Sequence, residues 1–384
     1  MLLIDYSKIL AFHMLSASYQ LTKDIAPIRK RVIPYLKRAN QWVAKYDMRR
    51  GRGPIRNYPV NVTLQATYRC NLSCPMCFRQ TVMAESFPKL NTLEIPIEDF
   101  TKIADQLFPY AYTVNLSIAG EPFLYTILDQ ILPLLDKYQC KIEAYSNMTP
   151  LTNEKLMDKV LPHMALLTAS IDGATPETFE KIRKGAKFNA VVKALEQFGT
   201  KRKAYLPDNC PTFALNVTIQ QDNVRELPDL VRLAKRVGAD YICGDHIVTY
   251  DDPELMKTSM VQDMDTYILY YEEAVKIGQE IGIEVRLRPP VYENKEEETS
   301  KLIQNSNQPV RMECPFLWRQ VVINPNGNTY ACCHPEPPLY GPDGINDFWS
   351  VWDSPEARKL RSQLQSDETH PSCRNCWIKY PVKD

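Results

Sequence analysis

Three cysteines stand close together in the first quarter of the sequence. Cys70, Cys74 and Cys77 form a CxxxCxxC pattern within the segment TYRCNLSCPMCF. Thiolates at such short spacings bind three corners of a cubane iron–sulfur cluster, which leaves one iron atom without a protein ligand. A structural zinc site would normally use a fourth protein ligand. The spacing therefore favours a cluster with one open coordination position over zinc or plain structural cysteines.

A second group of cysteines lies near the end of the sequence. Cys314 and Cys332 are followed, after a gap, by Cys373 and Cys376, which form a CxxC pair. Four thiolates suit either a four-cysteine zinc site or a fully ligated [4Fe–4S] cluster. The spacing alone does not favour either metal.

The amino-acid composition narrows the class of protein. Of the 384 residues, 44% are hydrophobic, which is ample for a packed core and argues against disorder. The 46 Lys and Arg residues balance 46 Asp and Glu residues, so no overall positive field draws the protein to nucleic acid or to an anionic membrane. No Walker loop, GxGxxG or GxSxG motif occurs, which leaves hydrolase and nucleotide-phosphate chemistry without support.

The sequence predicts neither a membrane span nor a secretory signal. Its longest apolar stretches, such as residues 164–171, are much shorter than the roughly 20 residues that span a bilayer. The N-terminal stretch contains Asp5 and Lys8 and lacks a small-residue cleavage site. We therefore expect a cytoplasmic protein, in which clustered cysteines bind metals more often than they form disulfides.

The first cysteine group follows the first of several short β-rich runs, which alternate with amphipathic helical patterns. The predicted strands cover residues 62–66, 113–118, 141–145, 166–171, 213–219 and 240–242. Strict alternation of strand and helix predicts an α/β fold with right-handed βαβ units and a parallel sheet. We expect a partial (β/α)6 barrel, with a flat doubly wound sheet as the alternative.

Changes in composition predict four segments. Residues 1–58 form a basic helical extension, in which Pro27 and Pro34 interrupt two weak helices and RGRGP is typical of a hinge. Residues 59–250 form the partial barrel, and residues 251–311 contain a helix, a strand at 284–288 and an acidic linker. Residues 312–384 form a small Cys-rich domain that has too few aliphatic residues to fold around a core of its own.

At this point the sequence resembles the radical S-adenosylmethionine (radical SAM) superfamily. In that family a CxxxCxxC loop holds a [4Fe–4S] cluster, whose open iron binds the amino and carboxylate groups of S-adenosylmethionine (SAM). The segment Ala119, Gly120, Glu121 and Pro122 after the second strand is similar to the family's GGEP motif, which meets the SAM amino group. Ala119 replaces the first glycine of that motif, and Met76 stands where an aromatic residue often precedes the last cysteine. Neither departure removes a ligand.

Polar residues near the ends of later strands are similar to family positions that approach the rest of SAM. They are Ser146, Asn147, Ser170, Asp172, Asn216 and Thr218. Arg183, in the segment KIRKG, stands where related enzymes often place an arginine on the SAM carboxylate. All lie at or beyond the strand ends where (β/α) barrels carry their active sites. Taken singly, each has a structural alternative: Glu121 could cap a helix, Asp172 could belong to a turn and Arg183 could be a surface cation.

The string CPFLWRQVVINPNGNTYACC resembles the start of the SPASM/twitch extension of radical SAM enzymes, which carries auxiliary clusters. The resemblance is to the short form with one auxiliary [4Fe–4S] cluster, and its ligands would be Cys314, Cys332, Cys373 and Cys376. Cys333 is left over beside Cys332. It packs against the cluster in the simpler interpretation, but a thiol near a site that makes substrate radicals could also donate a hydrogen atom. Cys333 is therefore our candidate catalytic residue.

The resemblance implies an enzyme that reductively cleaves SAM to a 5′-deoxyadenosyl radical, which removes hydrogen from a substrate carbon. We expect a peptide or protein substrate, modified with the help of the auxiliary cluster, because many enzymes with this extension act on ribosomally made peptides. A radical dehydrogenase or epimerase of a sugar or other small polar metabolite is the alternative, and a non-catalytic zinc-binding protein is the alternative from another class. The expected electron source is a one-electron donor such as flavodoxin or ferredoxin; neither a nucleic-acid nor a membrane partner is expected.

Overall fold

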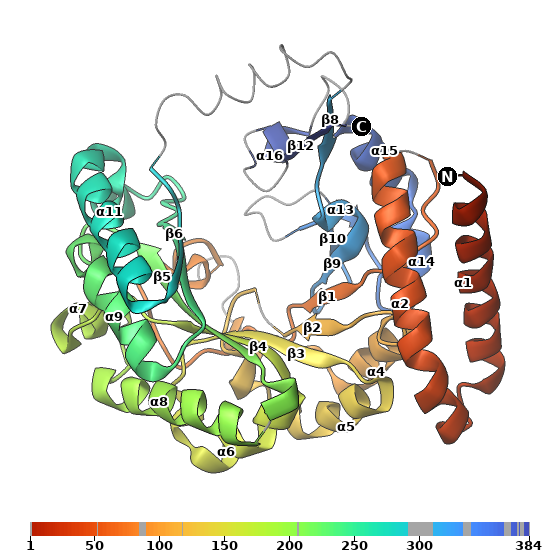
Figure 1. Cartoon of the computed structure of the whole chain (residues 1–384), viewed down its shortest axis with the longest axis horizontal. Helices are drawn as coiled ribbons and strands as arrows, with labels where there is room; N and C mark the ends of the chain where they lie inside the picture. Colours follow the sequence, from red (N-terminus) through yellow and green to blue (C-terminus); the bar gives the residue numbers. More distant parts are fainter. Residues whose placement is uncertain are drawn as a thin grey trace.

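Seven parallel strands form one curved sheet in the computed structural model, which describes residues 2–51, 53–83, 90–116, 118–205, 207–290, 310–332, 339–364, 370–374, 376 and 380–383. The strands lie side by side in chain order, and each neighbouring pair is parallel. They are β1 (Asn61–Leu64), β2 (Thr113–Asn115), β3 (Lys141–Ser146), β4 (Met164–Ser170), β5 (Thr212–Ile219), β6 (Tyr241–His246) and β7 (Glu284–Leu287). Figure 1 shows the sheet curving from β1 round to β6. The predicted α/β partial barrel is confirmed.

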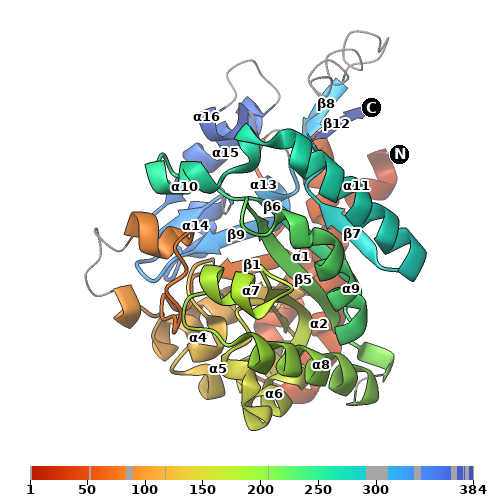
Figure 2. The same ribbon diagram turned by 90° about the vertical axis from the view of Figure 1, so that its left-hand side faces the viewer.

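Amphipathic helices cover the outer side of the curve, as Figure 2 shows for α7, α8, α9 and α11. In α4 (Ile97–Leu107) the buried side chains are the four at positions 100, 103, 104 and 107, which repeat with helical spacing. α9 (Leu227–Val237) ends at Gly238, whose φ of 77° is left-handed and suits glycine. The other helices of this region are α5 (Leu128–Tyr138), α6 (Glu154–Val160), α7 (Pro176–Ile182), α8 (Phe188–Tyr205), α10 (Pro253–Thr258) and α11 (Met264–Ile281).

The C-terminal segment continues the sheet beyond β1. Strand β9 (Gln320–Ile323) pairs in parallel with β1, and β10 (Thr329–Tyr330) and β11 (Leu339–Gly341) follow in antiparallel order, which makes a ten-stranded sheet. Two flanking main-chain bonds extend the pairing, from Val60 N to Arg319 O at 2.8 Å and from Gln65 N to Ile323 O at 2.8 Å. The remaining elements are β8 (Val310–Glu313), α13 (Phe316–Arg319), α14 (Phe348–Trp352), α15 (Pro355–Gln363), α16 (Pro371–Arg374) and β12 (Tyr380–Lys383).

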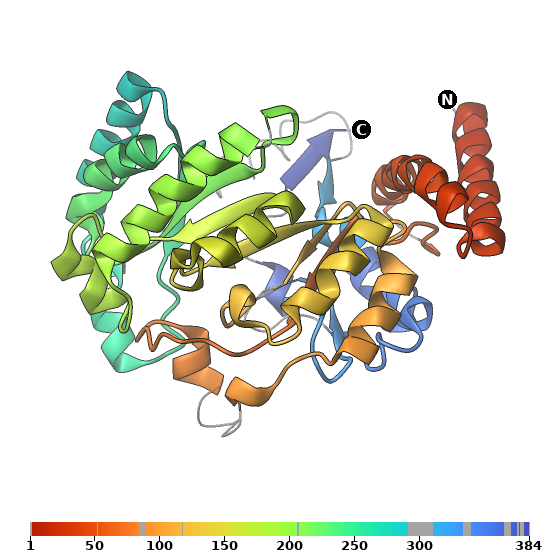
Figure 3. The ribbon, with the colours of Figure 1, turned by 90° about the horizontal axis from the view of Figure 1, so that it is seen from below.

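Two long helices precede the sheet, α1 (Leu2–Thr22) and α2 (Ala26–Arg50), and Figure 3 shows them at one edge of the molecule. Pro27 lies in the first turn of α2, where a missing N–H costs nothing, but Pro34 lies inside the helix. The prediction that Pro34 interrupts the helix is therefore wrong. Burial of Ile33, Leu36 and Val43 on the face that packs against the protein outweighs the lost backbone bond.

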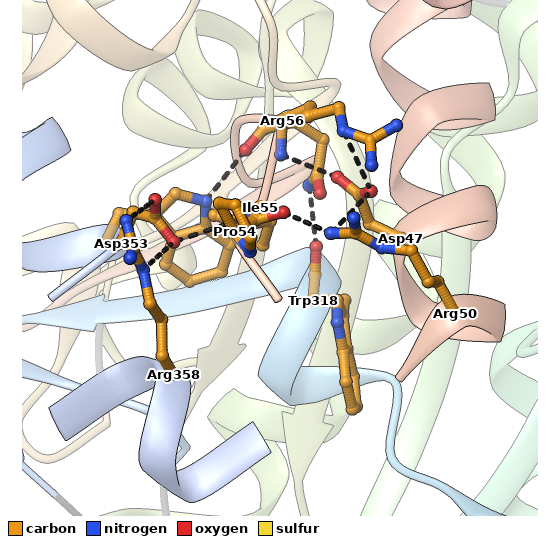
Figure 4. A network of polar contacts seen from close by, with 10 residues as sticks. Asp47, Arg50, Pro54, Ile55, Arg56, Trp318, Asp353 and Arg358 are labelled. Atoms are coloured by element: carbon orange, nitrogen blue, oxygen red, sulfur yellow. Dashed lines mark hydrogen bonds and ion pairs between the residues drawn. The ribbon is translucent and has the colours of Figure 1, made fainter. Parts of the chain in front are cut away.

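The chain that leads from α2 to β1 is hydrogen-bonded on both sides, as Figure 4 shows, and the hinge at RGRGP stays a prediction. Buried Asp47 accepts a hydrogen bond from Arg56 N at 2.6 Å, and Asp353 accepts one from Ile55 N at 3.1 Å. Asn57 donates to Trp318 O at 2.7 Å, and Trp352 Nε1 donates to Asn57 O at 2.8 Å. Residues 55–57, between α2 and β1, therefore join α2 to the C-terminal segment.

Two predicted features lie outside the described residues. They are the acidic linker around residues 292–309 and Cys333. The boundaries of the four segments remain predictions. Among the residues that the structure places, none of the helices combines the length and the apolar character that crossing a bilayer requires.

Asn40 provides a test of how α2 is attached to the chain around Tyr58 and Tyr110. Its fully buried amide donates to Tyr58 O at 3.0 Å and to Tyr110 O at 3.2 Å, and it accepts from Tyr58 N at 2.8 Å. We expect Asn40→Ala to lower the free energy of unfolding by about 3 kcal/mol, because it leaves buried main-chain groups without partners. Urea denaturation measures the change, and Arg38→Ala on the exposed side of α2 is the control. Equal stability of the two variants would show that these hydrogen bonds do not hold α2 in place.

Candidate active site

A cavity of about 760 Å3 lies where the carboxyl ends of the parallel strands meet the C-terminal segment. The sulfur-bearing residues Cys70, Cys74 and Cys77 line it, and so does Cys332 from the second cysteine group. Active sites of (β/α) barrels lie at this end of the sheet because the loops there carry the variable side chains. The structure thus brings the two cysteine groups to one cavity.

The loop that carries the first three cysteines is tied to neighbouring strand ends. Asn71 donates to Thr149 Oγ1 at 2.7 Å, and Asn147 Nδ2 donates to Asn71 Oδ1 at 3.1 Å. On the other side, Ser73 N donates to Lys184 O at 3.0 Å. These bonds hold the loop over the end of the sheet.

The three thiols supply the donor set of a cubane cluster, in which each cysteine binds a different iron atom. Among the described residues, no group of three His, Cys, Asp or Glu side chains is arranged to hold a single metal ion. Burial raises the pKa of Cys74 to about 11 and also raises the pKa of Cys70. Both thiols therefore keep their protons until a metal replaces them.

Gly120 makes the closest backbone approach in the site. Its φ is 96°, and a Cβ at this position would lie 2.7 Å from Thr67 O, so glycine is required. Ala119, by contrast, sits on the preceding turn, where Gln65 Oε1 accepts from Ala119 N at 2.8 Å and from Ile118 N at 3.0 Å. Gly120, at the second position of the GGEP-like segment, is thus the position at which the backbone conformation requires glycine.

Glu121 is fully buried beside the cavity and is held by three donors. Ser146 Oγ donates to Oε1 at 2.8 Å, Asn147 N donates to Oε2 at 2.7 Å, and Phe123 N donates to Oε1 at 3.3 Å. The last bond caps the short turn that begins at Pro122, so Glu121 is also the cap residue that the simpler interpretation suggested. Burial outweighs these donors and raises the pKa of Glu121 to about 7.

Arg183, which lines the cavity, forms an ion pair with Asp172, which is fully buried behind it. Arg183 Nε donates to Asp172 Oδ2, and Thr218 N donates to Asp172 Oδ1 at 2.7 Å. Burial alone would lower the pKa of Arg183, but Asp172 and the nearby Cys74 raise it above its ordinary value. Arg183 is therefore charged and fixed in position.

The cavity wall contains most of the residues that the sequence assigned to SAM. Those that line it are Gly120, Glu121, Ser146, Asn147, Ser170, Arg183, Asn216 and Thr218. Pro122 and Asp172 do not line it. Asp172 instead positions two residues that do line the cavity, because its carboxylate accepts hydrogen bonds from Arg183 and from the main chain of Thr218.

The second group of cysteines gathers around the junction of β8, α13 and α16. Burial, with smaller contributions from the neighbouring Cys376 and Cys373, raises the pKa of Cys314 to about 11, against main-chain donors of the following residues that lower it. Tyr340, which is fully buried, has its pKa raised by burial and by Cys314, Cys332 and Cys373. The antiparallel pairing of β12 with β8 brings the end of the chain back to Glu313, next to Cys314. Four thiols thus lie in one neighbourhood, as a fully ligated cluster requires.

Sequence reasoning missed two contributions to the site. Gln65, 2% exposed, also donates through Nε2 to Thr67 O at 2.7 Å, so it joins the end of β1 to the turn before Glu121. Phe78 packs against Tyr250 with ring centroids 5.4 Å apart, at the side of the cavity where the chain leaves β6. Gln65 could have been found from the sequence, because a polar amide at the end of an apolar strand indicates a role at the site. The contact of Phe78 with Tyr250 could not, because the two residues are too far apart in the sequence for a local pattern to show it.

Comparison with known families agrees with this geometry. Residues 64–234 match the model of the radical SAM superfamily, and residues 314–377 match the SPASM model, an iron–sulfur cluster-binding domain. The chain is 22% identical over 306 residues to the antilisterial bacteriocin subtilosin biosynthesis protein AlbA of Bacillus subtilis (strain 168), with 79% of this chain and 61% of that protein covered. It therefore spans less than two thirds of that relative.

A second relative has a different printed role. The chain is 24% identical over 335 residues to the tungsten-containing aldehyde ferredoxin oxidoreductase cofactor-modifying protein of Pyrococcus furiosus. That match covers 82% of this chain and 86% of the relative.

Among solved structures, SuiB of Streptococcus suis bound to S-adenosylmethionine is similar, with a TM-score of 0.60, 14% identity, and 90% of this chain and 80% of that chain covered. SuiB bound to its precursor peptide SuiA gives a TM-score of 0.57 at 12% identity, with 86% and 72% covered. At these identities the likeness establishes the fold. Together with the two family matches and the two cysteine groups at one cavity, it shows that the chain belongs to the radical SAM superfamily and carries a C-terminal SPASM domain.

Proposed function

We propose that this radical SAM enzyme, whose cofactors are SAM, a [4Fe–4S] cluster and an auxiliary [4Fe–4S] cluster, modifies a peptide or protein substrate. One observation carries the proposal: a single cavity is lined both by the first cysteine loop and by the C-terminal strands. Gln320, Asn324, Tyr330 and Cys332 come from the C-terminal side. A substrate in this cavity would lie between the two cysteine groups.

The residues of the cavity wall suit the parts of SAM. Ionised Glu121 would accept hydrogen bonds from the SAM ammonium group, and Arg183 would bind the carboxylate. Ser146, Asn147 and Ser170 supply hydroxyl and amide groups that suit the ribose and the methionine portion. When bound, the cofactors supply a carbon-centred radical that removes hydrogen from an unactivated carbon, while the surrounding protein orients the substrate and excludes water.

The proposed substrate class rests on the relatives and on the chemistry of the wall. The relatives AlbA and SuiB are named for the biosynthesis of a bacteriocin and for a complex with a precursor peptide. Five described lining residues on the side of β1, β2 and β9 carry neutral amide or hydroxyl groups, which suit the N–H and C=O groups of a peptide. They are Thr63, Gln65, Asn115, Gln320 and Asn324.

A small polar metabolite is the second candidate substrate. It is favoured by the relative from Pyrococcus furiosus, which is named a cofactor-modifying protein and is covered over 86% of its length. A radical dehydrogenase or epimerase would use the same cavity.

Replacing one ligand from each cysteine group separates the roles of the groups. We expect wild-type protein purified without oxygen to hold about eight iron atoms, as two [4Fe–4S] clusters require. Cys70→Ser should lose about half of the iron and all 5′-deoxyadenosine formation. Cys373→Ser should lose a similar amount of iron and all product but retain part of the SAM cleavage. Zinc in place of iron, product retained by both variants, or equal SAM cleavage in the two variants would contradict the assignment.

The raised pKa of Glu121 predicts a pH dependence of SAM binding. Below a pKa of about 7 the carboxyl group is protonated and can no longer attract the SAM ammonium group. We expect the affinity of the wild type for SAM to fall roughly tenfold per pH unit below that value, because one proton must leave for each SAM bound. Glu121→Gln should bind weakly at every pH. Calorimetry from pH 5.5 to 8.5 measures this, and an unchanged pH slope in the variant would remove Glu121 from the site.

The substrate class can be tested before the substrate itself is identified. Host cells grown in D2O give a deuterated lysate, whose fractions are incubated anaerobically with enzyme, reductant and SAM. We expect deuterium to enter 5′-deoxyadenosine with the peptide-sized fraction, and this transfer to disappear after the fraction is digested with protease. Transfer that survives digestion, or that follows the fraction of smallest molecules, would replace the peptide by a metabolite. A wild-type sample with unlabelled lysate is the control.

A further inference from the structure

A buried arginine stands directly behind the first cysteine loop. Arg79 follows Cys77 by two residues, is 7% exposed and begins the short helical turn Arg79–Met83. Gln80 N and Thr81 N donate to Cys77 O at 2.7 and 3.0 Å, so the chain turns back immediately after the last cysteine. This turn directs the Arg79 side chain toward the start of the loop.

The Arg79 guanidinium closes the loop by bonding to residues on its other side. Nε donates to Tyr68 O at 2.7 Å, and Nη2 donates to Asn91 Oδ1. The same Asn91 oxygen accepts from Cys70 N at 3.4 Å. Arg79 therefore connects the chain before Cys70, the chain after Cys77 and an oxygen that also holds the Cys70 backbone.

The charge of Arg79 is not cancelled by these partners. A main-chain carbonyl and an amide oxygen are both neutral, in contrast to Asp172, which pairs with the other buried arginine of the cavity, Arg183. Arg79 lines the same cavity as Cys70, and its guanidinium and the Cys70 N–H donate to the same Asn91 oxygen, which places its positive charge beside the first cysteine. A fixed positive charge in a buried site acts strongly on neighbouring charge, because little water screens it.

We propose that Arg79 is a positioning residue that fixes the cysteine loop and, as a cation beside Cys70 whose hydrogen-bond partners among the described residues are neutral, raises the reduction potential of the cluster held there. One-electron reduction adds one negative charge and neither forms nor breaks a covalent bond. A cation held near the ligands therefore stabilises the reduced form, in line with the known effect of local charge on cluster potentials. The inference rests on the assignment of Cys70, Cys74 and Cys77 as cluster ligands.

The test compares three variants as loaded enzymes. Arg79→Met removes both charge and hydrogen bonds, and Arg79→Lys keeps the charge but loses the two-armed contact. Arg69→Met removes a cation from the same loop that is 43% exposed and already paired with Glu94 at 3.6 Å. The readout is a redox titration with dithionite as electron donor, followed by electron paramagnetic resonance. The cluster at Cys70 is identified by the signal that changes on addition of SAM.

At a fixed solution potential we expect Arg79→Met to lower the ratio of reduced to oxidised cluster at least tenfold, which is about 59 mV for a one-electron couple. Arg79→Lys and Arg69→Met should stay within threefold of the wild type. A wild-type ratio in Arg79→Met, or an equal drop in Arg69→Met, would overturn the inference. If Arg79→Met loses its iron, Arg79→Gln takes its place in the same comparison. The ligand assignment is tested separately: wild-type iron content in Cys70→Ser would show that this assignment has failed.

Discussion

The parallel pairing of β9 with β1 is the contact on which the arrangement of the active site depends. Main-chain hydrogen bonds place β9 of the C-terminal segment directly beside β1, the strand that leads into the first cysteine loop. Cys332 consequently reaches the cavity that Cys70 lines. A linker alone would leave the two cysteine groups at variable separation, whereas a shared sheet fixes it.

The two charged side chains Glu121 and Arg183 are stabilised in the cavity by different kinds of partner. Glu121 lies among neutral donors, and burial dominates its ionisation. Arg183 keeps its charge because Asp172 accompanies it, and Asp172 is in turn held by a backbone N–H of β5. Each charged group is fixed before any ligand arrives, which is how a protein avoids the free-energy cost of reorganising polar groups when a charged cofactor binds.

Much of the fold and of the site could be predicted because the signals are local. Short β-rich runs predicted the strands to within a few residues. The three-cysteine loop and the turn at Gly120 are each a short continuous segment, so each shows as a local motif. The pairing of β9 with β1 joins residues more than 250 positions apart, and no local pattern contains it. Pro34 misled because its local effect on a helix is outweighed by packing of the opposite face. Asp172 was placed at the right strand end, but only the partners of its carboxylate show that it acts through Arg183.

The buried state of the cysteine thiols also affects how the protein acquires its iron. Burial raises the pKa of Cys74 and Cys314 and so disfavours their thiolate forms; these groups are poor nucleophiles in the empty protein and are shielded from alkylation and oxidation at neutral pH. The same property means that assembly must release a proton from each buried thiol as its iron–sulfur bond forms. Maturation in the cell is therefore expected to be sensitive to acidity at a stage before any SAM is turned over.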